Sequence, residues 1–169
     1  VAVSLIYEDG ILVEASTRGD GYVGQDVLAN VKTIKGLPLN VNTAKGKIFG
    51  RLEVRGEVYL TFSQLDIINK KAISLGEKPL ANTRNGASGT LKLLDPKVVA
   101  ERGLSILCYQ VLGNIPTQMD ALYFLRLYDF PTDLSVRQVT KKDIINKINL
   151  YNEVRRTLAY AIDGVVVKV

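Results

Sequence analysis

Residues 51–60 read RLEVRGEVYL, and this run is the clearest indication of the fold. Apolar residues and one glycine alternate strictly with five polar or aromatic residues, which are Arg51, Glu53, Arg55, Glu57 and Tyr59. Because successive side chains of a β-strand point to opposite faces, the alternation predicts a strand with one face in the core and one charged face. Such a charged face is typical of a solvated surface with cross-strand ion pairs. Gly56 favours a second interpretation, since a strand interior tolerates glycine poorly unless something, such as a bound ligand, approaches the backbone closely.

Further strands and helices are expected on both sides of this run. Residues 1–8 and 11–18 are β-type runs joined by Asp9-Gly10, a favoured two-residue hairpin turn. More strands are expected at 104–112 and 163–169, and loops at 36–50 and 82–89. Helices are expected within 26–34, at 62–75 and 90–94, and after the capping-box-like Thr117-x-x-Asp120 and Thr140-x-x-Asp143. Antiparallel hairpins mixed with separate helices predict an α+β fold and not a regular βαβ alternation.

The composition removes several kinds of chemistry. The 169 residues contain no histidine, which excludes Ser-His and Cys-His nucleophile pairs and imidazole metal sites. The one cysteine, Cys108, excludes a disulfide framework and a multi-cysteine zinc site within this sequence. The formal net charge of +5 favours a polyanion as partner but does not identify one. Catalysis would therefore have to use Lys, Arg, Asp, Glu, Tyr and backbone groups.

The length and the two ends of the sequence indicate a piece of a longer protein. A chain of 169 residues, 47% hydrophobic and 23% charged, fits one globular domain with a substantial core. No apolar run approaches the ~20 residues of a membrane span, and no signal peptide is visible. The sequence begins at Val1 in a strand-like run and ends at Val169 in another. We expect residues 1–169 to be one unit that is truncated at both ends.

Residues 19–24 match the G-x-G-x-x-G pattern of dinucleotide-binding folds. The context argues against that interpretation, because the preceding element is a predicted hairpin and no acidic residue occurs between Gly36 and Gly50, where a ribose-binding carboxylate should stand. We expect a turn with a functional Arg18 at its edge.

Two other stretches have residue types that suit a nucleotide. Residues 82–92 read NTRNGASGTLK and combine Arg84 and Lys92 with small and hydrogen-bonding residues; such a loop before a helix suits phosphate oxygens, although it can also be plain surface. Residues 163–169 read DGVVVKV, and Val166 and Lys168 share one face of the expected strand. An apolar side chain beside an ammonium suits a flat base with a phosphate, while the alternative is a buried strand whose lysine reaches to water. Tyr109 can be either a core tyrosine or a base-stacking one.

Taken in order, five stretches resemble the adenylation (nucleotidyltransferase) domain of bacterial NAD-dependent DNA ligases. They cover nearly the whole chain and are the following: Thr17-Arg18-Gly19-Asp20-Gly21 with the run from Gly24 to Ile34, residues 52–58 (LEVRGEV), residues 81–91 (ANTRNGASGTL), Cys108-Tyr109, and residues 163–169. Each motif alone is weakly to moderately specific, and their order and spacing make the combination specific.

The resemblance implies a fold, a reaction and partners. The family fold has two mainly antiparallel sheets flanked by helices, with AMP held between them. The implied reaction seals nicks in duplex DNA through lysyl-AMP and DNA-adenylate intermediates, with NAD as the AMP donor and Mg²⁺ as the metal. It also implies a bacterial, cytoplasmic and nucleoid-associated enzyme of DNA replication and repair, a monomer in which this unit works with further ligase domains. Such chemistry depends on charge neutralisation and alignment, which agrees with the absence of histidine.

The resemblance also implies roles for individual residues. Lys168 would contact the α-phosphate, Val166 would pack against the adenine, and Tyr109 would stack on its opposite face. Glu57 would hold the ribose or position the reacting lysine. The remaining implied roles are ribose and phosphate binding by Arg18, orientation of Mg²⁺ or of the lysine network by Asp163, and binding of nucleotide or DNA phosphates by Arg84 and Lys92.

The chain departs from the family pattern in three places. The family's nucleophile belongs to a Lys-x-Asp-Gly motif directly before the residues that match Val1, so this chain starts just after it and is expected to be inactive alone. The near match at Arg18 cannot replace the nucleophile, because a guanidinium stays protonated whereas burial beside cations can lower the pKa of a lysine. Lys92 stands where relatives commonly have Arg and Thr83 where they commonly have Pro, which puts the bidentate phosphate contact of position 92 in doubt.

Two other functions agree with the same residues. A non-catalytic nucleic-acid-binding module would use Arg84, Lys92 and the net charge without a nucleotide pocket. A nucleotidyltransferase relative that uses ATP or GTP would share most of the pocket, and residues 17–21 and 82–91 favour the NAD branch only by resemblance.

Overall fold

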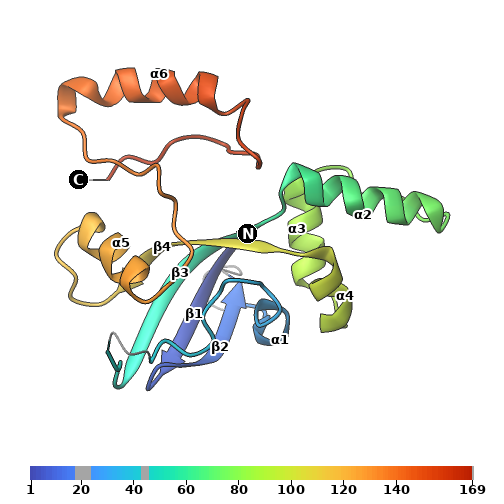
Figure 1. Cartoon of the computed structure of the whole chain (residues 1–169), viewed down its shortest axis with the longest axis horizontal. Coiled ribbons are helices and arrows are strands. Elements are labelled where there is room, and N and C mark those ends of the chain that lie inside the picture. The colour runs from blue at the N-terminus through green and yellow to red at the C-terminus, as the bar shows by residue number, and fades with distance from the viewer. Residues whose placement is uncertain (18–23, 43–45, 169) are drawn as a thin grey trace.

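The computed structural model describes residues 1–17, 24–42 and 46–168. Its centre is a four-stranded antiparallel sheet in the order β2-β1-β3-β4 (Figure 1). The strands are β1 (Ala2–Glu8), β2 (Ile11–Thr17), β3 (Arg51–Tyr59) and β4 (Ser105–Leu112). The helices of the described residues are α1 (Leu28–Val31), α2 (Phe62–Ser74), α3 (Thr83–Leu91), α4 (Pro96–Arg102), α5 (Gln118–Leu127), a 3₁₀ turn η1 (Lys141–Asp143) and α6 (Ile144–Val154). The predicted α+β class is confirmed.

The β1–β2 hairpin turns at Asp9 and Gly10, as the sequence predicts. Both residues have positive φ, 47° at Asp9 and 82° at Gly10, which is the conformation of a two-residue turn that matches the twist of the flanking strands. Asp9 also fixes the entry to β3, because its carboxylate accepts a hydrogen bond from the backbone nitrogen of Gly50 at 2.8 Å. The turn therefore places β3 beside β1.

Strand β3 lies in the middle of the sheet, between β1 and β4. Its predicted alternation is confirmed, with Leu52, Val54, Gly56 and Val58 on the buried face. A β-bulge in the pairing with β4 follows Arg55, which pairs with Gln110, while Gly56 pairs with Cys108. Tyr109 is thus the extra residue of β4 at this point.

Gly56 is needed for packing within the sheet. A Cβ atom at this position would lie 3.0 Å from the Ile106 side chain and 3.1 Å from the Leu107 carbonyl oxygen. The close neighbour is strand β4, so the glycine does not by itself indicate a ligand. The group that lies close to the Gly56 backbone is the neighbouring strand β4, through Ile106 and Leu107.

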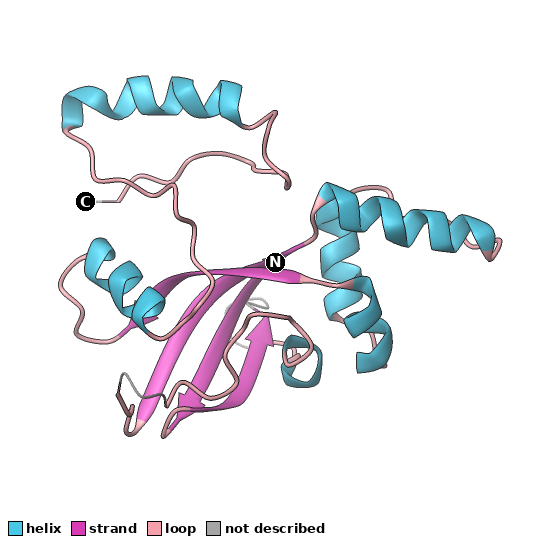
Figure 2. Cartoon of the chain, in the orientation of Figure 1, coloured by secondary structure: helices cyan, strands magenta, loops and turns pink. Residues whose placement is uncertain are grey.

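One continuous core lies against the buried face of the sheet. It combines Leu5 and Val54 with Val31 of α1, Leu91 of α3 and Val99 of α4, all of which are fully buried. Burial of such a side chain contributes roughly 1.5–3 kcal/mol to the free energy of unfolding. These contacts hold α1, α3 and α4 next to the sheet, as Figure 2 shows.

The segment 82–102 corrects three sequence-based expectations. Residues 82–89 are not a loop, because Asn82 caps α3 by accepting a hydrogen bond from the Asn85 nitrogen at 2.8 Å. Of the short helix expected at 90–94, only residues 90 and 91 are helical, as the end of α3. Helix α4 was not expected; it starts at Pro96, after the Asp95 cap, and ends at Gly103 with φ of 65°. The sequence of α3 consists mainly of small and polar residues, so it lacks the apolar stripe by which an amphipathic helix is recognised.

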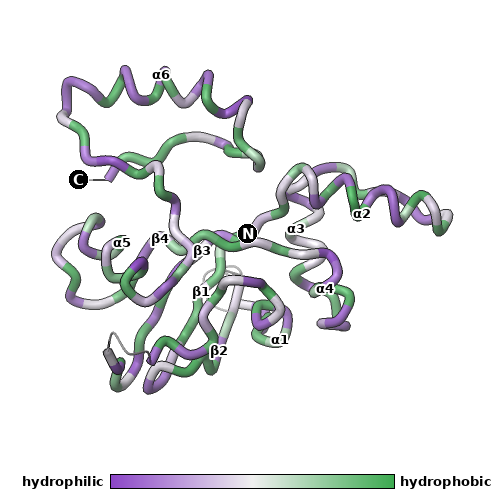
Figure 3. Tube along the Cα trace, in the orientation of Figure 1, coloured by the Kyte–Doolittle hydropathy of each residue, from purple (hydrophilic) through white to green (hydrophobic). Residues whose placement is uncertain are grey.

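The two capping-box-like signals are confirmed as helix starts. The Thr117 hydroxyl accepts from the Asp120 nitrogen at 3.1 Å and begins α5. The Thr140 hydroxyl donates to the Asp143 carboxylate at 2.6 Å, and the chain then runs through η1 into α6. Hydrophobic and hydrophilic residues alternate along α6 in Figure 3, and its apolar residues Ile148 and Tyr151 are only half-buried.

The strand expected at 163–169 is not formed. Residues 161–168 are extended but pair with no strand of the described chain, and Figure 2 shows them as a loop. A β-strand needs a partner for its backbone groups, and its apolar face needs a layer to cover it. Val165 and Val167 therefore remain exposed. The described residues accordingly contain one sheet and not the two that the family fold implies.

The helices of the described residues can be compared with the requirements of a membrane span. None of the helices in the described ranges combines the length and the hydrophobicity that a membrane span requires.

Candidate functional site

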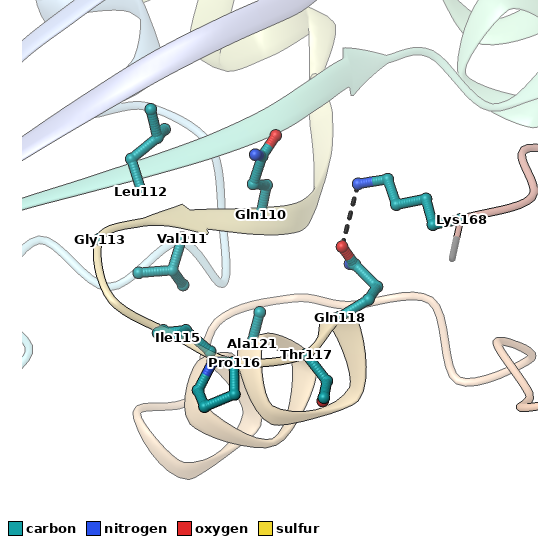
Figure 4. A pocket seen from close by; sticks show the side chains of 10 residues that line it. All are labelled: Gln110, Val111, Leu112, Gly113, Ile115, Pro116, Thr117, Gln118, Ala121 and Lys168. Carbon is teal, nitrogen blue, oxygen red and sulfur yellow. Dashed lines mark hydrogen bonds between the residues drawn. The ribbon is translucent and has the colours of Figure 1, made fainter.

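Lys168, Gln118 and Tyr109 form the centre of the candidate site. The Lys168 ammonium donates a hydrogen bond to the Gln118 Oε1 atom at 2.9 Å (Figure 4). The same nitrogen lies 5.7 Å from the centroid of the Tyr109 ring, within the range of a cation–π contact. Gln118 also donates from Nε2 to the Tyr109 carbonyl oxygen at 2.5 Å. These contacts bring the C-terminal segment, α5 and β4 together at one point.

An open hollow of about 660 Å³ lies beside this cluster. We call it the Lys168 hollow; it is lined by Gln110, Val111, Leu112, Gly113, Ile115, Pro116, Thr117, Gln118, Ala121 and Lys168. Figure 4 shows the side chains of Lys168 and Gln118 meeting at its edge, with apolar side chains on the opposite wall. Its size falls within the ~300–1,000 Å³ of small-molecule sites, and its mixed wall suits a ligand with an apolar and a charged part.

Glu57 lies on the sheet face opposite the core. Its strand partners are Ala2 on β1 and Leu107 on β4, so it is diagonally adjacent to Tyr109. The Glu57 carboxylate accepts a hydrogen bond from the amino nitrogen of Val1 at 2.6 Å, and its side chain is 53% exposed. Glu57 does not line the Lys168 hollow. The structure thus puts Glu57 and Tyr109 on neighbouring strands, and neither residue lines the Lys168 hollow.

The charged face of β3 divides into two parts. At one end, Glu53 accepts a hydrogen bond from the Ser4 hydroxyl of β1 at 2.7 Å, which is a cross-strand contact, and it lies 3.8 Å from the Arg55 guanidinium on its own strand. At the other end, the Tyr59 ring packs on the Tyr160 ring with centroids 4.9 Å apart. The backbone nitrogen of Phe62 donates to the Ala159 carbonyl at 2.9 Å nearby. The second end therefore anchors the C-terminal segment close to Glu57.

Burial at the Tyr59–Tyr160 contact changes the acidity of both side chains. Burial is the main cause that raises the pKa of Tyr59 and of Tyr160 above their ordinary value of 10.0, and the charge of Asp133 raises both further. Both phenols therefore stay protonated at neutral pH and act here as packing and hydrogen-bonding groups.

Arg84 and Asp163 form an ion pair. The Arg84 Nη1 atom lies 2.9 Å from the Asp163 carboxylate, and the two side chains are 79% and 85% exposed. The described residues contain no group of three or more His, Cys, Asp or Glu residues arranged to hold a metal ion. Asp163 therefore supplies a single carboxylate, which faces a guanidinium in this structure.

Lys92 lies apart from the Lys168 hollow. It follows the last residue of α3 and lines a second, smaller hollow of about 180 Å³ with residues 25–30, 93 and 94. Arg84 stands in the first turn of the same helix, roughly 12 Å away at ~1.5 Å per residue. This spacing suits contacts of Arg84 and Lys92 with two phosphates along a chain of phosphates.

Two other expected site residues are differently placed. Val166 is 80% exposed and does not line the Lys168 hollow. Arg18 and residues 19–23, for which the sequence predicts a turn, lie outside the described residues. Thr17 and Gly24 lie close together, because a Cβ atom at Gly24 would be 2.2 Å from the Thr17 carbonyl oxygen.

Sequence reasoning missed Gln118, Tyr59 and Tyr160. Gln118 was visible only as the residue after the expected cap Thr117, and a glutamine at the start of a helix is not a sign of function. Tyr59 and Tyr160 are 101 positions apart in the sequence, so their stacking arises from the fold alone. The one signal for Gln118 is a polar residue at a predicted helix start, and it becomes informative only when the fold brings that helix start next to the expected lysine.

Comparisons with known proteins identify the family of the chain. A family model described as the NAD-dependent DNA ligase adenylation domain matches residues 1–169. The chain belongs to that family of nucleotidyltransferase domains. Similar proteins include the DNA ligases of Hahella chejuensis (42% identical over 175 residues), Phytoplasma mali (43% over 173) and Citrifermentans bemidjiense (44% over 179). Each match includes 100% of this chain, which spans only 25% to 26% of the length of these relatives.

Proposed function

We propose that this chain is the core of the adenylation domain of an NAD-dependent DNA ligase that seals nicks in duplex DNA. The observation that carries the proposal is the contact of Lys168 with Tyr109, in a chain that matches the family along residues 1–169. An ammonium beside an aromatic ring is a suitable place for a base and the phosphate attached to it. The proposed reaction needs residues beyond this chain, in agreement with relatives about four times as long.

In this proposal the residues of the chain bind and align the nucleotide. NAD would supply the adenylyl group and a nicotinamide mononucleotide leaving group. Lys168 would neutralise the α-phosphate, while Tyr109 and Val166 would pack on opposite faces of the adenine. Val166 is exposed in this structure, so packing on the adenine requires the backbone around Val166 to turn toward the sheet while Lys168 keeps its contacts with Gln118 and Tyr109.

Glu57 would act at the ribose or on the reacting lysine. Its exposed carboxylate lies on the sheet face opposite the core, on the strand next to that of Tyr109, and this place supports either role. Arg18 would hold the ribose and phosphate from the turn after β2.

The phosphate and metal roles rest on exposed groups. Arg84 and Lys92 would bind nucleotide or DNA phosphates, since exposed cations on one helix suit a polyanion. Asp163 is the proposed Mg²⁺ residue. Mg²⁺ is commonly held by one or two carboxylates together with substrate phosphates, so a single carboxylate fits only if phosphates complete the shell and Arg84 releases it.

The wider setting follows from the same proposal. The complete protein would act as a monomer in the bacterial cytoplasm, on the nucleoid, in DNA replication and repair. The residues directly before Val1 would supply the nucleophile, and a further domain would grip the nicotinamide half of NAD.

The direct test is AMP transfer to the complete ligase that contains this domain. With NAD and Mg²⁺, mass spectrometry of the intact protein should show the added mass of one AMP. ATP and GTP in place of NAD should give no such gain, and a gain with ATP would instead indicate the ATP-dependent relative. Salt-sensitive DNA binding without any AMP adduct, and without protection of the fold by NAD or AMP, would support a non-catalytic nucleic-acid-binding module.

A further inference from the structure

Gln118 connects two residues of the candidate site to each other. Its Oε1 atom accepts from Lys168 at 2.9 Å, and its Nε2 atom donates to the Tyr109 carbonyl at 2.5 Å (Figure 4). An ammonium is only a donor and a backbone carbonyl is only an acceptor. The two neighbours therefore require the same orientation of the Gln118 amide, and the flipped amide would face both with the wrong atom.

The start of α5 fixes the position of Gln118. Thr117 caps the helix through the Asp120 nitrogen, and Gln118 is the first helical residue. Ala121, one turn further along α5, is buried in the core and holds this end of the helix in place. The Gln118 side chain thus projects from a rigid element, unlike that of Lys168.

Lys168 has few other restraints. It belongs to an extended segment that has no strand partner among the described residues, and a lysine side chain has four rotatable bonds. Its ammonium contacts the Gln118 oxygen and the Tyr109 ring. Because Gln118 takes one of three ammonium hydrogens, two remain for a phosphate.

We propose that Gln118 is a positioning residue that holds the Lys168 ammonium beside Tyr109 for contact with the α-phosphate. This inference rests on the proposed function, because it assumes that Lys168 acts in AMP transfer. Binding of the dinucleotide depends on many contacts, whereas the rate of transfer depends on the alignment of the ammonium with the reacting phosphate. Loss of Gln118 should therefore lower the maximal rate more than it raises the NAD concentration for half-maximal rate.

The test uses the complete ligase and single-turnover formation of the AMP adduct. The variants are Gln118→Met, Lys168→Ala, the double variant, and Gln138→Met as a matched control at an exposed loop position. Gln118→Met keeps the length of the side chain and removes both hydrogen bonds. We expect Gln118→Met to reduce the maximal rate about tenfold with a change of less than about twofold in the half-maximal NAD concentration. In the Lys168→Ala background, Gln118→Met should cause no further reduction of the maximal rate, because Gln118 acts through the Lys168 ammonium.

Each outcome decides between the alternatives. Three results for Gln118→Met would overturn the positioning role: a rate equal to that of Gln138→Met, a faster rate, or a reduction that multiplies with that of Lys168→Ala in the double variant. The proposed function would still stand in these cases, because wild-type protein would form the AMP adduct. Wild-type protein that forms no adduct would instead contradict the proposed function. If Gln118→Met unfolds at a lower temperature than wild type, Gln118→Ala, which suits the first turn of a helix, must show the same fall in rate.

Discussion

The Arg84 guanidinium and the Asp163 carboxylate lie 2.9 Å apart, and this ion pair joins the first turn of α3 to the extended segment 161–168. Both groups were expected from the sequence to face substrate, one toward phosphate and the other toward a metal. In this structure each neutralises the other. A phosphate or a metal ion that binds at either group must therefore compete with the pair.

The pair should contribute little to stability. Both side chains are largely exposed, and exposed ion pairs typically contribute ~0.2–1 kcal/mol, which salt screens further. A double-mutant cycle of Arg84→Ala and Asp163→Ala, measured by urea denaturation, should give a coupling energy below about 1 kcal/mol that shrinks at high salt. A larger, salt-independent coupling would mean that the pair is a structural contact and not a place for ligands.

Lys168→Ala should lower AMP transfer without unfolding the protein. An exposed ammonium has little to lose in packing, whereas removal of one charged group from a reacting phosphate lowers rates on the order of 100-fold. Single-turnover adduct formation and thermal unfolding in the complete ligase provide the two measurements. Lys142→Ala, on the exposed η1 turn, is the matched control. An unchanged rate in Lys168→Ala would remove Lys168 from the site.

Glu57→Ala distinguishes a catalytic carboxylate from a solvated strand face. If Glu57 acts on the ribose or the reacting lysine, the rate of AMP transfer should fall by at least about tenfold, with a stability change within about 0.5 kcal/mol. Glu101→Ala on α4 removes a carboxylate that is similarly exposed and bonded to Lys71 at 2.6 Å, and it should leave the rate unchanged. Equal rates for the two variants would favour the solvated face.

Gly56→Ala and Gly89→Ala should change stability in opposite directions. A methyl group at Gly56 would meet Ile106 and Leu107 at 3.0 to 3.1 Å, so overpacking should destabilise the protein by about 1–3 kcal/mol. A methyl group at Gly89 on α3 meets nothing within 4 Å, and alanine favours the helix by about 0.5–1 kcal/mol. Urea denaturation of both variants measures the difference. A neutral Gly56→Ala would show that β4 can move away from β3.

Cys108 should make the protein less stable at alkaline pH. Burial raises the pKa of its thiol from 9.0 to about 12, so the folded state keeps a proton that the unfolded state releases. The stability present below pH 9 is then lost progressively as the pH rises toward 12. Urea denaturation at pH 8 and pH 10.5 should show this fall, and Cys108→Ala should reduce it. An identical fall in Cys108→Ala would assign the effect to other groups, such as the buried Tyr7.

Sequence and tertiary structure decided different properties of this protein. The sequence by itself determined the hairpin at Asp9-Gly10, the alternation of β3 and the cap at Thr117, because turns, strand faces and helix caps depend on residues within a few positions. The order of its motifs also indicated the family. Only the tertiary structure decided that Gly56 accommodates β4, that Arg84 meets Asp163, and that Gln118 joins Lys168 to Tyr109. Those contacts join residues between 9 and 79 positions apart, and the positions of such pairs depend on how the sheet and helices pack. Whether 163–169 forms a strand also depends on tertiary structure, since its backbone groups need a partner that local sequence cannot supply.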